Sequence, residues 1–177
     1  TRRGSAQLQT ELRFPASNAS IPENRLTNPD QKFQMELTGN NRVVIAFGSN
    51  LGNKAANINM AISQINQTCG KVAQISSFHR SEPMGFDSSN EFLNGCLLLL
   101  TDLSPQNLLI QLKEIEVSMG RIKTSDHYED RLIDLDIILY ENLCIQTPNL
   151  QIPHPKYQER AFVLEPLMEL DLGFSPF

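Results

Sequence analysis

The chain has 177 residues, which is enough for one compact domain and short for two. Apolar residues make up 40% and charged residues 20%, an ordinary composition for a globular protein with a core. The net charge of −5 and the lack of a basic stripe disfavour a nucleic-acid partner, because an acidic surface repels phosphates. Apolar runs such as residues 96–100 are far too short to cross a bilayer, so we expect no membrane span.

The first 41 residues differ in composition from the rest of the chain. They are rich in Asn, Gln, Ser and Pro and have no apolar periodicity, so we predict a poorly structured extension or linker over residues 1–41. Its acidic residues and the lack of an apolar signal region disfavour a targeting peptide. Residues 42–177 are the predicted domain. The three cysteines are scattered and form no CxxC motif, which favours reduced thiols and a cytoplasmic location.

The first half of this domain contains a strand, a helix and two further strands. Residues 43–47 are a short apolar run typical of a buried strand, and a turn-rich loop follows over residues 48–53. Apolar residues at helical spacing predict a helix over residues 54–66. Residues 72–80 and 92–101 are predicted strands.

The second half begins with a well-marked helix. Ser104 is a good helix N-cap, Pro105 suits the first helical position, and Gly120 suits the C-terminal end. Residues 132–140 are the next predicted strand. The order strand, helix, strand, strand, helix, strand predicts an α+β sandwich, in which two helices cover one face of a mainly antiparallel sheet.

Two aspartates, Asp134 and Asp136, lie on this last strand. A strand has a period of two, so both carboxylates should emerge on one face, about 6–7 Å apart at their origins, while Leu135 and Ile137 point into the core. Two adjacent carboxylates repel each other, and oxygen ligands with open positions for phosphates suit Mg²⁺. The alternative is that one aspartate only caps the strand and the other faces water.

Cationic side chains precede the aspartates. Arg131 stands just before the strand, and Arg121, Lys123 and His127 lie in the preceding polar loop. Carboxylates beside cations suit a bound polyphosphate, whose oxygens need both a divalent metal and guanidinium partners.

Further candidates follow the strand. His154 lies between two prolines, and Arg160 stands shortly before Phe162. His154 has the alternative of a rigid loop histidine, and Arg160 that of a solvated charge at the start of a helix. For Phe162, as for Phe92 on its strand, the alternative is a place in the core.

These residues resemble the motifs of the 6-hydroxymethyl-7,8-dihydropterin pyrophosphokinase family. The sequence Arg131-Leu-Ile-Asp134-Leu-Asp136, following Gly120-Arg121, is similar to that family's signature. Five more segments occur in the family's order, at residues 46–52, 81–85, 92–94, 153–154 and 160–162.

The resemblance implies a ferredoxin-like α+β sandwich and an enzyme of the folate pathway. Such an enzyme transfers pyrophosphate from ATP to 6-hydroxymethyl-7,8-dihydropterin and releases the pterin diphosphate and AMP. It leaves open whether the chain is joined to, or works beside, other folate-pathway enzymes.

The resemblance also implies roles for individual residues. The catalytic residues would be Arg121, Arg131, Asp134 and Asp136, of which the two aspartates would hold two Mg²⁺ ions. The ATP contacts would be Glu116, Lys123, Arg131, Ile137, His154 and Arg160. The pterin contacts would be Ser81, Glu82, Met84, Phe92, Asn94 and Phe162.

The loop before the signature arginine departs from the family pattern. Glu129 and Asp130 stand where relatives usually have Gly-Pro, and we expect these carboxylates to oppose phosphate binding and to loosen or reshape the loop. Thr124 and His127 occupy positions that are often basic, and Tyr128 replaces a frequent tryptophan.

Two other function classes remain open at this point. A ferredoxin-like sandwich also occurs in nucleic-acid-binding modules, although these usually combine exposed aromatics with basic neighbours. A nucleotidyl transferase, or an inactive relative that only binds nucleotide, would use many of the same residues.

Overall fold

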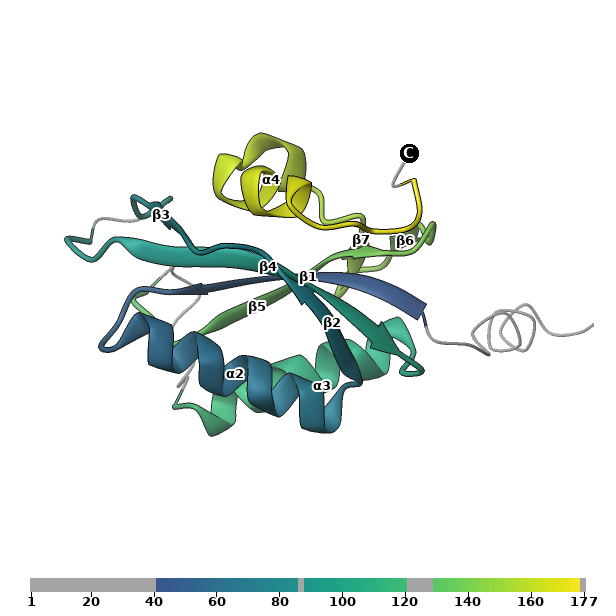
Figure 1. Cartoon of the computed structure of the whole chain (residues 1–177), viewed down its shortest axis with the longest axis horizontal. Coiled ribbons are helices and arrows are strands. Elements are labelled where there is room, and N and C mark those ends of the chain that lie inside the picture. The colour runs from purple at the N-terminus through teal and green to yellow at the C-terminus, as the bar shows by residue number, and fades with distance from the viewer. Residues whose placement is uncertain (1–40, 86–87, 121–128, 176–177) are drawn as a thin grey trace, which may run out of the picture.

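The computed structural model describes residues 41–85, 88–120 and 129–175, so the predictions made for residues 1–40 and for Arg121, Lys123, Thr124, His127 and Tyr128 lie outside it. Within these ranges the chain forms a sheet with the strand order β2-β4-β1-β5, and β3 also pairs with β4. All of these pairings are antiparallel. Helices α2 and α3 cover one face of the sheet and α4 lies on the other face (Figure 1).

The α+β class is confirmed, and the predicted elements follow one another as expected, although one predicted strand is divided in two and further elements follow β5. The elements are, in chain order, β1 (Asn41–Ser49), α2 (Lys54–Thr68), β2 (Lys71–Ile75), β3 (His79–Ser81), β4 (Phe92–Thr101), α3 (Pro105–Ser118), β5 (Asp134–Tyr140), β6 (Ile145–Gln146), β7 (Gln151–Ile152), the 3-10 turn η1 (Tyr157–Glu159) and α4 (Ala161–Met168). The Ser104 hydroxyl caps α3 by accepting a hydrogen bond from the Asn107 N–H at 3.3 Å, as predicted. Gly120 follows that helix with a φ of +99°, a conformation that suits glycine.

Two local predictions were wrong, and one helix was left out of the predicted order. The single strand predicted over residues 72–80 is two strands, β2 and β3. The break lies at Ser76, where the side-chain hydroxyl, rather than a backbone carbonyl, accepts the hydrogen bond from the Cys96 N–H at 3.0 Å. The loop predicted to begin at Gly48 begins later, since β1 continues to Ser49 opposite β4. The predicted order of elements ended at β5, so it did not include α4, which covers the second face of the sheet.

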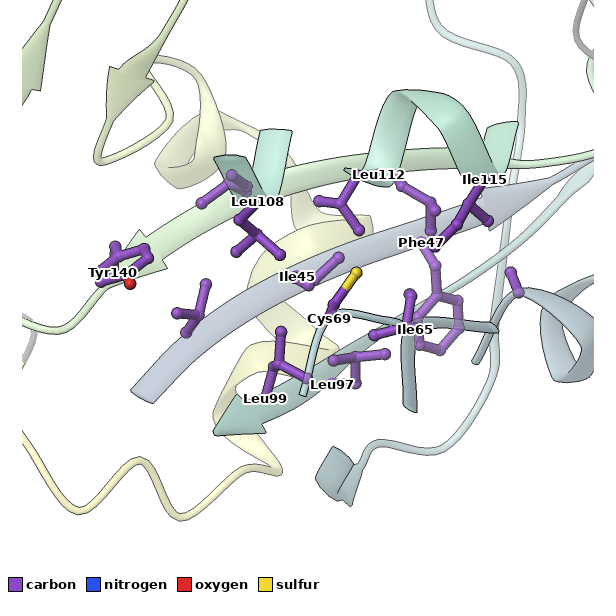
Figure 2. Packing of buried hydrophobic residues seen from close by; sticks show 14 of the residues in the cluster. Ile45, Phe47, Ile65, Cys69, Leu97, Leu99, Leu108, Leu112, Ile115 and Tyr140 are labelled. Carbon is purple, nitrogen blue, oxygen red and sulfur yellow. The ribbon is translucent and has the colours of Figure 1, made fainter. Parts of the chain in front are cut away.

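The core has two layers because the central strands are buried on both faces. Between the sheet and α2 and α3 lie side chains that include Ile45, Phe47, Ile65, Leu97, Leu99, Leu108, Leu112, Ile115 and Tyr140 (Figure 2). The smaller layer under α4 includes Val44, Cys96, Leu98, Ile138, Val163 and Leu167. Alternate residues of one strand therefore enter opposite layers, as the pleat requires. In the described part of the chain, no helix is long and apolar enough to cross a membrane.

Candidate active site

Asp134 and Asp136 project from the same face of β5. Leu135 and Ile137, which alternate with them, are buried in the layer under α2 and α3. Both aspartates line a pocket on the opposite face, where α4 begins. The shared face predicted from the period of a strand is therefore confirmed.

The pocket brings together residues from distant parts of the sequence. Its empty volume, with the open mouth included, is about 680 Å³. Of the predicted site residues, those that line it are Ser81, Glu82, Met84, Phe92, Asn94, Arg131, Asp134, Asp136, Arg160 and Phe162. They come from β3 and the turn after it, from β4, from β5 and its approach, and from the start of α4. Every pterin contact implied by the resemblance is among them.

The two aspartates form an electrostatically unfavourable pair. Burial, and then repulsion by Asp134, raise the pKa of Asp136, while Lys113, His154 and Arg160 oppose the rise. Among the described residues, no group of three or more His, Cys, Asp or Glu side chains could hold a metal by itself. Two carboxylates with the remaining positions open to phosphate or water fit Mg²⁺, which usually keeps such ligands.

Arg131 lies between the carboxylates and the aromatic part of the pocket. Its Nη1 is 3.1 Å from Asp134 Oδ2, and its side chain is only 10% exposed. The guanidinium carbon is 6.0 Å from the centre of the Phe92 ring. Arg160 lies in the same way over Phe162, at 5.7 Å. Each of the two aromatic rings is thus within reach of a cation.

Asn94 lies at the base of the pocket, beside a glycine. Its Nδ2 donates to the Ser81 hydroxyl at 2.9 Å, and the residue is 5% exposed. A Cβ placed on Gly48 would lie 2.8 Å from Asn94 Oδ1. A side chain at this position of β1 would therefore displace the Asn94 amide.

Three of the residues predicted to contact ATP do not line the pocket. Glu116 is buried on α3, and its Oε1 accepts hydrogen bonds from the Leu135 N–H at 2.7 Å and Lys113 Nζ at 3.0 Å. Ile137 lies in the core. The backbone N–H of His154 donates to the Ile138 carbonyl at 2.9 Å, and burial lowers the pKa of the imidazole. Their contacts with ATP remain predictions.

Asn50, Asn90 and Asp130 form a second polar cluster, which the sequence analysis did not predict. Asn50 Nδ2 donates to Asp130 Oδ1 at 2.6 Å, and Asn90 Nδ2 donates to Asp130 Oδ2 at 2.7 Å. The Asp130 carboxylate, which we expected to oppose phosphate binding and loosen the loop, is thus bound to two neighbouring loops. Only the long-range pairing of β1, β4 and β5 brings these residues together.

Comparison with known proteins identifies the family of the chain. Residues 44–172 match the family model of 7,8-dihydro-6-hydroxymethylpterin-pyrophosphokinase (HPPK). The folic acid synthesis protein FOL1 of Dictyostelium discoideum is 37% identical over 95% of this chain, but the match covers only 25% of that longer protein. The 2-amino-4-hydroxy-6-hydroxymethyldihydropteridine pyrophosphokinase of Porphyromonas gingivalis is 36% identical over 76% of this chain and 93% of its own length.

A solved structure supports the ferredoxin-like fold. The HPPK-DHPS of Plasmodium falciparum in complex with pteroate matches 77% of this chain and 42% of its own, with a TM-score of 0.61. At 13% identity this likeness concerns the fold alone. The sequence matches by themselves lead to the conclusion that the chain belongs to the 7,8-dihydro-6-hydroxymethylpterin-pyrophosphokinase family.

Proposed function

We propose that this chain transfers pyrophosphate from ATP to 6-hydroxymethyl-7,8-dihydropterin in folate biosynthesis, and releases the pterin diphosphate and AMP. The observation that carries the proposal is the pocket itself, in which two phenylalanines and a buried amide adjoin paired carboxylates and two arginines. A flat heteroaromatic ring and a polyphosphate chain are the ligands that suit these two halves.

The aromatic half would hold the pterin. Phe92 and Phe162 offer ring faces, and stacking contributes about 0.5–1.5 kcal/mol for each aromatic pair beyond the burial of area. The Asn94 amide, held by Ser81, would read the hydrogen-bonding edge of the ring. Glu82 and Met84 would complete that end of the pocket.

The charged half would hold ATP and its metal. Asp134 and Asp136 would bind two Mg²⁺ ions, whose charge would offset that of the phosphate oxygens. Arg131 and Arg160 line this half of the pocket and would bind the phosphates. The other proposed ATP contacts are Glu116, Lys123, Ile137 and His154, and Arg121 is a further proposed catalytic residue.

The protein's part in the reaction would be positioning and charge stabilisation. The hydroxymethyl oxygen of the pterin forms a bond to the β-phosphorus, the bond between that phosphorus and the oxygen of AMP breaks, and the hydroxyl proton passes to water. Arg131 and Arg160 would neutralise the charge that moves toward AMP. Holding both substrates in line replaces a bimolecular encounter with an oriented one.

Product analysis tests this proposal. The chain is incubated with ATP, Mg²⁺ and 6-hydroxymethyl-7,8-dihydropterin, and the products are separated by chromatography. We expect AMP and the pterin diphosphate in equal amounts, and loss of both when EDTA removes the metal. Release of pyrophosphate would instead indicate nucleotidyl transfer, and the absence of any product would indicate a relative that only binds nucleotide.

We also propose a setting for the activity. Cys69, Cys96 and Cys144 are free thiols, which supports a reducing compartment such as the cytoplasm. Several relatives are longer proteins, including a folate synthesis bifunctional protein of Arabidopsis thaliana. We therefore infer that this domain works beside, or joined to, other folate-pathway enzymes. The size of the native protein on an immunoblot would distinguish these two arrangements.

A further inference from the structure

Asp130 joins three loops at the edge of the pocket. One loop follows β1 and contains Asn50, another precedes β4 and contains Ser88 and Asn90, and the third leads into β5 and contains Asp130 itself. The two Asp130 oxygens each accept a hydrogen bond from a different asparagine, at 2.6 and 2.7 Å. Hydrogen bonds from Ser88 first, and also from Asn90 and Asn50, hold the pKa of Asp130 below its usual range.

The same cluster holds the backbone of Arg131 in place. Asn50 Oδ1 accepts the Arg131 N–H at 2.7 Å, and the Asn50 N–H donates to the Arg131 carbonyl at 3.2 Å. Asn50 is 1% exposed, so water does not compete for these bonds. The Asn50 side chain donates through its amide nitrogen to Asp130 and accepts through its oxygen from Arg131. It therefore couples the position of the Asp130 carboxylate to that of the Arg131 backbone.

The other side of the cluster leads to the aromatic half of the pocket. Asn90 stands two residues before Phe92, over whose ring the Arg131 guanidinium lies at 6.0 Å. The contact between Asn90 and Asp130 therefore fixes the distance between the loop that carries the arginine and the strand that carries the ring. One carboxylate connects the proposed phosphate and pterin halves.

We propose that Asp130 is a positioning residue, which links the Asn50 and Asn90 loops and thereby holds Arg131 against Asp134 and Phe92. The expected change in kcat/KM rests on the proposed function. The expected change in loop structure rests on the hydrogen-bond geometry alone. Its effect is opposite to that expected from charge, since a carboxylate near a phosphate site would weaken ATP binding. A substitution that neutralises Asp130 therefore decides between the two roles: kcat/KM for ATP falls if Asp130 positions Arg131 and rises if its charge dominates.

Asp130→Asn is the decisive variant because it keeps the shape of the side chain but replaces one acceptor with an NH₂ group. That group opposes the NH₂ of Asn50 or of Asn90, so one hydrogen bond is lost. We expect kcat/KM for ATP to fall about ten- to hundredfold. If charge dominates, kcat/KM for ATP rises instead, and the proposal is overturned.

An exchange of partners supplies the rescue. In the double variant Asp130→Asn with Asn90→Asp, the amide at position 130 donates to the carboxylate at position 90, and the net charge of the pair is unchanged. We expect activity to return to within about threefold of the original, a coupling that a double-mutant cycle measures. Failure of the double variant to recover above Asp130→Asn would contradict the proposal. Glu91→Gln is the matched charge control, expected to change kcat/KM by less than about threefold, since its carboxylate pairs with the exposed Arg80 at 3.4 Å.

Hydrogen exchange separates this inference from the proposed function. In Asp130→Asn, the backbone amide hydrogens of peptides that span residues 88–95 and 129–133 should exchange faster than in the parent. In the double variant their exchange should slow again to the rate of the parent. Hydrogen exchange is measured without turnover. An inactive parent protein would therefore refute the proposed function but would leave the test of the positioning role unaffected. Unchanged exchange in Asp130→Asn would refute the positioning role even if activity fell. If Asp130→Asn fails to fold, the single variant Asn90→Asp takes its place in the experiment. It breaks the same contact because it sets two carboxylates against each other.

Discussion

The guanidinium of Arg131 forms an ion pair with the carboxylate of Asp134, with 3.1 Å between Nη1 and Oδ2. The two residues are three positions apart, one before β5 and one at its first position. Arg131 is largely buried, so its orientation is set before a substrate arrives. A cation thus adjoins the carboxylates proposed to bind Mg²⁺, and a phosphate placed between them would contact both kinds of partner.

Arg131→Lys should show whether the planar fork of this side chain matters. Lysine keeps the charge but cannot form two parallel hydrogen bonds to a phosphate or rest flat over Phe92. We expect kcat/KM for ATP to fall about ten- to hundredfold, close to the value of one lost charged hydrogen bond. Arg80→Lys is the control, since that arginine is 79% exposed and contacts only Glu91 in the described interactions. Equal, small effects of the two substitutions would remove Arg131 from the reaction.

Asp134→Ala and Asp136→Ala should abolish turnover and leave the fold intact. Each removes one of two proposed Mg²⁺ ligands, and the loss of such charge stabilisation costs at least about 100-fold. The milder Asp136→Asn also removes the repulsion by Asp134, so its melting temperature without Mg²⁺ should be equal to or higher than that of the parent. Added Mg²⁺ and ATP should stabilise the parent only. Asp102→Asn is the control, because Asp102 is exposed and follows the end of β4. Unfolding of the Asp136 variants would count against a metal role.

Gly48→Ala should weaken pterin binding more than ATP binding. The added Cβ would lie 2.8 Å from Asn94 Oδ1, so the amide must move from Ser81 or from the pterin edge. Loss of about one hydrogen bond predicts a roughly tenfold higher KM for the pterin. If the effect passes through Asn94, Asn94→Ala should be no worse when Gly48→Ala is added. Additive losses, or an equal rise of both KM values, would contradict this explanation.

The sequence predicted the elements that local rules govern. The cap at Ser104 and the shared face of Asp134 and Asp136 depend on spacings of one to three residues, and the structure has both. The break at Ser76 escaped prediction because it arises from a side chain that competes with the backbone of a strand 20 residues away.

The site shows the same division between local and long-range effects. The aspartates and arginines that line the pocket were found through the chemistry of their residue types, and the pterin contacts through the resemblance to the family. The contact between Asn50 and Asp130 was missed because 80 residues separate them, and an asparagine in a turn is usual for local reasons. The charge of Asp130 suggested repulsion, whereas its hydrogen bonds depend on partners that only the register of β1 and β5 brings near.

Glu169 fastens the end of α4 to the segment that precedes β3. Its carboxylate accepts hydrogen bonds from the Ser77 N–H at 2.6 Å and from the Ser77 hydroxyl at 2.7 Å, and it pairs with His79 Nε2 at 2.6 Å. Because α4 carries Phe162 and β3 carries Ser81, this contact bears on the width of the pocket.

Glu169→Gln should therefore lower the free energy of unfolding in a pH-dependent way. The hydrogen bonds from Ser77, and then His79, lower the pKa of Glu169 from 4.5 to about 2. A carboxylate whose pKa is lower in the folded than in the unfolded protein stabilises the fold at pH values above its unfolded pKa. This contribution is lost as the pH falls from 4.5 toward 2. Urea unfolding should show a clear difference between parent and Glu169→Gln at pH 7 that narrows steadily below pH 4.5. Glu165→Gln, whose carboxylate is 64% exposed and 3.4 Å from His79 Nδ1, should have a smaller effect, and a difference that stays constant down to pH 2 would show that the Glu169 charge does not hold α4.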